Sequence, residues 1–91
     1  MASFVYHVGY DLVRPGQNYP LLWSYLGGIG VRVMLSAWVV ETPLYSSQLR
    51  DAMMRLLDDN DRVFITEITN CNWAGLNLPS DTIDLLRRRF P

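Results

Sequence analysis

The chain has 91 residues, which is enough for one domain and too few for a multidomain enzyme with a deep cleft of its own. Hydrophobic residues make up 49% and charged residues 19%, a globular composition that excludes a disordered chain. The formal net charge of −1 excludes nucleic-acid binding driven by the charge of the whole chain, so only a local basic patch could support it.

Cysteine usage and the N-terminal segment indicate where the protein resides. Cys71 is the only cysteine, which rules out a disulfide within the chain and a cysteine-based metal site. The segment 1–3 leads directly into a strand-like stretch and lacks the basic start and apolar core of a signal peptide. No run of about 18 uncharged apolar residues occurs. We therefore expect a cytoplasmic protein without a membrane segment.

The first half of the chain predicts a strand, a helix and further strand structure. Residues 4–10 are β-branched and aromatic and end at Asp11, which predicts a strand. Asn18 is a candidate helix cap, and apolar residues recur at helical spacing from Leu22 to Ile29, with Gly27, Gly28 and Gly30 expected to end that helix. Residues 31–41 favour β structure, as one long strand or as two strands around a turn near Ser36.

The second half predicts another helix, a strand and a less regular tail. Ser46 or Ser47 can cap a helix whose apolar stripe runs from Leu49 to Leu57. Residues 62–69 predict the last strand, and a short helix begins near Pro79-Ser80. We predict one α+β domain over residues 1–91, a ferredoxin-like βαββαβ sandwich with two helices on one face of an antiparallel sheet. Its core spans about 3–69, and 70–91 form a C-terminal helical extension.

The predicted sheet has two apolar faces, and two helices can cover only one of them. Residues 4–11 place aromatic or aliphatic side chains on both sides of the strand. A homodimer that packs sheet against sheet would cover the second face. His7 lies about 13 Å from Asp11 along the strand, so the two cannot chelate one ion within a chain, and a structural or interface role is expected for His7.

Several residues are candidates for chemistry, each with a simpler structural alternative. Asp11 could hold Mg²⁺, which takes one or two carboxylates, or it could cap the turn that follows the strand. Arg32 could bind phosphate and Trp38 could stack on a base, or they could be a strand-end arginine and a packed tryptophan. Three aspartates at 58, 59 and 61 are most simply a solvated turn, and Arg87-Arg88-Arg89 fits either nucleic-acid contact or a helix C-terminus.

Several blocks, taken in their order and spacing, resemble the CRISPR-associated protein two family, and most closely its stand-alone, SinR-like relatives. The blocks are Val8-Gly9-Tyr10-Asp11-Leu12, Arg32-Val33-Met34-Leu35-Ser36-Ala37-Trp38, Thr42-Pro43-Leu44 and Asp61-Arg62-Val63-Phe64-Ile65. The resemblance spans about residues 4 to 69. It implies a ferredoxin-like fold and a face-to-face homodimer.

The same resemblance implies a function. It makes Asp11 of each protomer the ligand of a shared Mg²⁺ for phosphodiester hydrolysis, with Tyr10 as its aromatic neighbour. Arg32, Ser36 and Trp38 match residues that line the same cleft, where they would contact nucleic acid, and Arg14 is the one basic residue that the loop after Asp11 offers.

Two functions therefore stay open. One is a Mg²⁺-dependent endonuclease acting on RNA or DNA. The other is a non-catalytic dimeric scaffold that binds nucleic acid or protein, either as an adaptation-complex subunit beside an integrase-type partner or as a toxin-like protein. The net charge of −1 weakens binding to a polyanion in either case.

Overall fold

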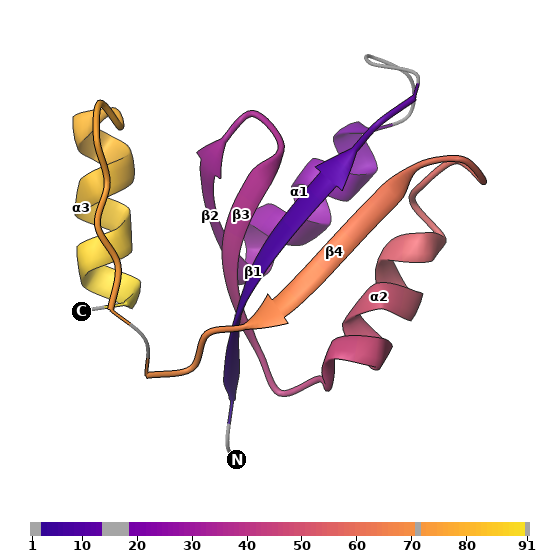
Figure 1. The fold of residues 1–91 in the computed structure, drawn as a ribbon, viewed down its shortest axis with the longest axis horizontal. Coiled ribbons are helices and arrows are strands. Elements are labelled where there is room, and N and C mark those ends of the chain that lie inside the picture. Colours follow the sequence, from indigo (N-terminus) through magenta and orange to yellow (C-terminus); the bar gives the residue numbers. More distant parts are fainter. Residues whose placement is uncertain (1–2, 14–18, 71, 91) are drawn as a thin grey trace.

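The described part of the chain forms a four-stranded antiparallel sheet with three helices (Figure 1). The computed structural model describes residues 3–13, 19–70 and 72–90. In chain order the elements are β1 (Phe4–Asp11), α1 (Pro20–Ile29), β2 (Gly30–Met34), β3 (Ala37–Thr42), α2 (Ser46–Met54), β4 (Arg62–Glu67) and α3 (Ser80–Arg89). The strand order is β2-β3-β1-β4. This confirms the predicted α+β class with an antiparallel sheet, and the arrangement is compatible with a ferredoxin-like domain.

Strand β1 lies inside the sheet and divides it into two faces. It pairs with β3 and β4, and its residues Tyr6, Val8 and Tyr10 are buried on the side of α1 and α2. Figure 1 shows both helices behind the sheet, as predicted. The alternate residues Val5, His7, Gly9 and Asp11 point to the opposite face, because side chains alternate along a strand.

Helix α1 is held by burial of Leu22 and Leu26, which are both fully enclosed in the core. Pro20 occupies the first turn, whereas the candidate cap Asn18 lies outside the described residues. The expectation that Gly27 and Gly28 end the helix is wrong, because the helix continues through both to Ile29. Beyond the helix's own backbone, nothing lies within 4 Å of where a Cβ would sit on either glycine, so neither glycine is needed for close packing. Burial of Leu22 and Leu26 outweighs the low helix propensity of the two glycines.

The segment 31–41 forms two strands, which decides between the two alternatives. Residues Leu35 and Ser36 make the turn between β2 and β3, and the pairing shifts register between Arg32 and Met34. At the start of β2, a Cβ on Gly30 would collide with the carbonyl oxygen of Val39. Glycine at this position therefore allows β2 to approach β3 directly after the helix.

The second half follows the prediction with small shifts in boundaries. Helix α2 begins at Ser46 with Tyr45 as its cap, whose N–H donates to Gln48 Oε1 at 2.8 Å. Neither Ser46 nor Ser47 is the cap, because Tyr45 takes that position and the Gln48 side chain accepts the hydrogen bond of its N–H group. Strand β4 ends at Glu67, two residues earlier than predicted, although the N–H of Ile68 still donates to Val5 at 2.7 Å.

Helix α3 covers part of the face that α1 and α2 leave open. Its Leu86 is 3% exposed, and Val31, which faces the same side as Val39 and His7, is buried next to it. The Trp73 indole N–H donates to the carbonyl of Phe90 at 2.9 Å and ties the preceding segment to the helix end. Within the described residues, none of the helices is long and apolar enough to cross a membrane.

Candidate functional site

Asp11 ends β1 with an exposed carboxylate on the face opposite α1 and α2. It pairs in register with Arg62 of β4 and borders two hollows, of about 320 Å³ and about 410 Å³. No hydrogen bond or ion pair reaches this carboxylate from residues 3–13, 19–70 or 72–90. An exposed strand-end carboxylate with no protein partner there is free to bind a cation from solvent.

The larger hollow brings together most of the residues singled out from the sequence. Four of the predicted site residues line it, and they come from β1 and from the β2–β3 hairpin: Tyr10, Asp11, Arg32 and Ser36. Leu12, Trp23 and Leu35 complete the lining. The hairpin places Arg32 and Ser36 beside the end of β1 because the N–H of Tyr10 donates to the carbonyl of Ser36 at 3.1 Å.

Arg32 is fixed at the edge of this hollow. Its Nε and Nη2 groups donate to the carbonyl of Leu35 at 3.2 and 2.5 Å, and its guanidinium carbon lies 5.1 Å from the ring centre of Trp23 and 5.9 Å from that of Trp38. Cation–π contacts of this kind orient a guanidinium without neutralising it. Within the described residues no carboxylate pairs with Arg32, so its positive charge stays available to an anion.

Tyr10 and Trp38 are buried beneath the hollow. They are 6% and 5% exposed, and the indole N–H of Trp38 donates to the Tyr10 hydroxyl at 2.9 Å. That hydroxyl lies 3.4 Å from the carbonyl of Leu35. This arrangement fits the packed-aromatic alternative for Trp38, because a ring so enclosed offers no open face to a base. In this structure both rings support Arg32 and the hairpin instead.

Two of the predicted residues remain, Ser36 and Arg14. Ser36 is exposed in the hairpin turn and is one of the residues that line the larger hollow. Arg14 lies outside the described residues.

Asp61 is a residue whose importance the sequence analysis missed. One of its carboxylate oxygens accepts hydrogen bonds from the Val13 N–H at 2.7 Å and the Tyr19 hydroxyl at 3.1 Å, and the other accepts the Asp58 N–H at 2.8 Å. These bonds tie the residues that follow Asp11 to the start of α1 and to the turn before β4. The sequence showed three similar aspartates, and only the tertiary contacts distinguish the structural one.

The donor set fits Mg²⁺ only in part within one chain. Among the described residues no group of three or more His, Cys, Asp or Glu side chains gathers around a point. Mg²⁺ keeps several water ligands and is often held by one or two carboxylates. Asp11 can therefore provide one ligand, and a second copy of the chain would be needed to provide another.

Comparison with known proteins supports the fold. No protein-family model matches the sequence. The chain is similar to the crystal structure of a hypothetical protein, TT1823, from Thermus thermophilus, with a TM-score of 0.63 and 26% identity over 86% of this chain and 96% of that one. The similarity covers nearly all of the other protein, so the two share an overall architecture.

Proposed function

We propose that this chain is a ferredoxin-like protein of the CRISPR-associated protein two type that acts as a homodimeric, Mg²⁺-dependent endonuclease on RNA or DNA. The observation that carries the proposal is the hollow at the end of β1. The exposed Asp11, the oriented Arg32 and the exposed Ser36 all line this one hollow. Together they combine a cation ligand with two donors for phosphate oxygens.

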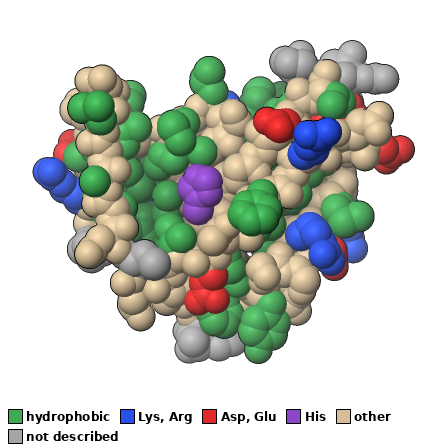
Figure 2. Space-filling model, viewed as in Figure 1, with side chains coloured by type: hydrophobic (Ala, Val, Ile, Leu, Met, Phe, Trp, Pro, Cys, Tyr) green, Lys and Arg blue, Asp and Glu red, His purple; other side chains and the backbone are tan. Residues whose placement is uncertain are grey.

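The open face of the sheet supports the dimer on which this proposal depends. Figure 2 shows the face, with His7, the one histidine, near its centre and hydrophobic side chains on both sides. Phe64 of β4 points to this side and is 74% exposed. Apolar surface left uncovered on a small domain is typical of an interface. A second copy packed on this face would bring its own Asp11 to the same side of the sheet.

In the proposed nuclease, each residue of the hollow would have a separate role. The two Asp11 carboxylates would hold Mg²⁺, which when bound supplies activation of the attacking water and neutralisation of the phosphate charge. Arg32 would donate from Nη1 to a phosphate oxygen, since its other donors already bind Leu35. The Ser36 hydroxyl would donate to a second oxygen. Among the described residues that line this hollow, Asp11 and Arg32 are the charged ones, so the proton of the attacking water would pass to bulk solvent.

A second candidate, a non-catalytic scaffold, is favoured by the scarcity of positive charge. Among the described residues that line the larger hollow, Arg32 is the one basic side chain, and the whole chain has a net charge of −1. Affinity for nucleic acid rises with the number of phosphates that are neutralised, so one arginine per protomer gives weak binding. In this case the dimer would join an integrase-type protein or another partner without cleaving nucleic acid.

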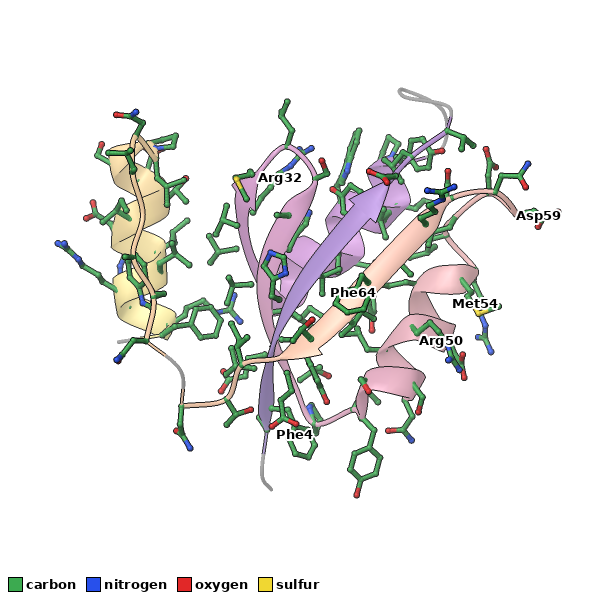
Figure 3. The ribbon with its side chains drawn as sticks, viewed as in Figure 1. Phe4, Arg32, Arg50, Met54, Asp59 and Phe64 are labelled. Carbon is green, nitrogen blue, oxygen red and sulfur yellow. The ribbon has the colours of Figure 1, made fainter. Side chains whose placement is uncertain are left out.

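Cleavage assays separate the two candidates. Labelled single- and double-stranded RNA and DNA are incubated with the protein in Mg²⁺ or in chelator, and the wild type is compared with Asp11→Asn and with the control Asp59→Asn. Asp59 is an exposed carboxylate on the turn before β4 (Figure 3). The nuclease proposal expects Mg²⁺-dependent cleavage that Asp11→Asn abolishes and Asp59→Asn retains. Absence of wild-type cleavage with an intact dimer supports the scaffold, and cleavage that survives Asp11→Asn overturns the role of Asp11.

A further inference from the structure

The two edges of the sheet are protected to different degrees. Strand β2 forms one edge, where α3 packs beside it (Figure 1) and its register with β3 is irregular. Strand β4 forms the other edge and pairs with β1 in regular register along all six of its residues. It contains no proline and no lysine, and its pairing shows no bulge. Proline, lysine and bulges usually prevent a further strand from adding to an edge, and β4 lacks all three.

The hydrogen bonds of β1 show which backbone groups of β4 point outward. The N–H of Ile68 donates to the carbonyl of Val5 at 2.7 Å, so every second residue from Ile68 back along β4 bonds to β1. The residues between them, Val63, Ile65 and Glu67, direct their N–H and C=O groups away from β1. Among the described residues, β4 pairs with no strand on that outer side.

A shallow groove lies along this outer side. It has a volume of about 180 Å³ and is lined by Ser46, Ser47 and Arg50 of α2 and by residues 63–65 of β4. Consecutive strand residues point to opposite faces, so a groove that touches all three must lie at the edge of the strand. A second hollow of about 460 Å³ shares Arg50 and Val63 with the first and extends the groove toward the turn before β4. Arg62 and three aspartates, at positions 58, 59 and 61, line this extension, so an acidic side chain fits the groove only at the Arg50 end.

We propose that the outer edge of β4 is a strand-addition site for an extended segment of another protein that carries one carboxylate opposite Arg50. The outward N–H and C=O groups of Val63, Ile65 and Glu67 would hydrogen-bond its backbone. Side chains on one side of the added strand would extend the open face of the sheet, and those on the other side would enter the groove. This mode of recognition combines main-chain hydrogen bonds with pockets for alternate side chains.

Charge complementarity selects an acidic residue for the groove. Arg50 lines the groove together with two serines at the first turn of α2, and guanidinium and hydroxyl groups are donors that a carboxylate accepts. The guanidinium of Arg50 lies 3.0 Å from Asp51, but both side chains are more than half exposed. Such a pair between exposed neighbours is weak, so Arg50 can exchange it for a carboxylate of the partner.

Titration of the ¹⁵N-labelled protein with a blocked peptide tests the proposal. The peptide acetyl-Thr-Val-Glu-Val-Thr-amide places glutamate in the groove and both valines on the side of Phe64. We expect saturable changes in the NMR chemical shifts of the backbone amides of Val63, Ile65 and Glu67 at millimolar peptide concentrations. A peptide methylated on the backbone nitrogens that face β4 should bind without these shifts or fail to bind. Shifts that survive methylation, or no saturable shift with the unmodified peptide, would overturn the proposal.

A charge exchange tests the predicted chemistry of the partner. Arg50→Glu should lower the affinity for the glutamate peptide about two- to fivefold. The same substitution should raise the affinity for a peptide with lysine in place of the glutamate by a similar factor. Unchanged affinities for both peptides would exclude the acidic preference. If the outward amides of β4 are already protected from hydrogen exchange in the free protein, the edge is occupied by a second copy and the proposal is wrong. None of these results depends on Asp11, so failure here leaves the cleavage assay as an independent test.

Discussion

At the scale of single residues, the structure separates carboxylates by what they contact. Asp11 and Asp61 both lie at strand ends in the sequence, yet only Asp61 accepts three hydrogen bonds from separate segments. Asp11 has no such contact within the described residues. Replacing a structural carboxylate is expected to change the free energy of unfolding, whereas replacing a ligand of an external ion is expected to change ion binding.

Replacing Asp61 by alanine should destabilise the fold. The Val13 and Asp58 N–H groups and the Tyr19 hydroxyl would lose an acceptor, and a loss of this kind costs about 1–3 kcal/mol in the free energy of unfolding. Urea denaturation measures this change, and Asp59→Ala should stay within about 0.5 kcal/mol of the wild type. Equal effects of the two substitutions would contradict the role given to Asp61.

Tyr6 gives the fold a dependence on alkaline pH. Burial raises its pKa above the ordinary value of 10.0, with further contributions from Glu67 and Tyr45, and its hydroxyl donates to the carbonyl of Leu44 at 2.8 Å. The folded state therefore keeps the proton to higher pH than the unfolded state. Its contribution to stability is complete below pH 10 and declines as the pH rises through the folded pKa.

Denaturation of wild type and Tyr6→Phe across the alkaline range measures this dependence. Tyr6→Phe should lose about 1 kcal/mol at neutral pH with its hydrogen bond and should show a smaller decline above pH 10. An identical pH profile for the two proteins would show that Tyr6 does not titrate as proposed.

At the scale of elements, sequence patterns predicted the helices and strands apart from the division of residues 31–41, and tertiary contacts decided the details. The stripe from Leu22 to Ile29 predicted α1, but only packing on the sheet explains why the helix continues through Gly27 and Gly28. The hairpin at Ser36 carried no turn signature such as Asn-Gly, so the sequence left its existence open. The position of α3 on the open face depends on contacts far apart in the sequence, which no local pattern contains.

Leu86 should control the attachment of α3. It is 3% exposed, and the last turns of α3 and strand β2 pack together there. Leu86→Ala should cost about 2–5 kcal/mol, as for other buried leucines, and should speed hydrogen exchange in α3 more than in β1. Leu85→Ala, at a position that is 43% exposed, is the matched control and should change exchange little. Equal exchange rates in α3 for both variants would mean that Leu86 does not hold the helix.

The sequence pointed to several residues that the fold brings together, and not to the geometry of the hollow that they line. The resemblance pointed to Asp11, Arg32 and Ser36, and the hairpin places all three around one hollow. The structure shows that Trp38 is enclosed and donates a hydrogen bond to Tyr10. The sequence could not show this, because it does not determine which face of β3 packs against the core. It also could not show that Arg32 would be held between two tryptophans, since Trp23 comes from a different element.

At the scale of the whole molecule, the proposed function depends on which face two copies share. Phe64 lies on the open face and is 74% exposed, whereas Leu21 lies on α1 and is 66% exposed. We predict that the wild type has the mass of a dimer by light scattering, that Phe64→Glu has the mass of a monomer, and that Leu21→Glu remains a dimer. A dimer that survives Phe64→Glu and not Leu21→Glu would place the interface on the helical side.

The most direct test of the central claim is calorimetric titration of the protein with Mg²⁺, with the mass of the same sample measured by light scattering. If Asp11 from two copies holds one ion, the stoichiometry is one Mg²⁺ per two chains, and Asp11→Asn abolishes the binding while leaving a dimer. Binding of one ion to each chain, or binding that Asp11→Asn leaves unchanged, would contradict the shared site.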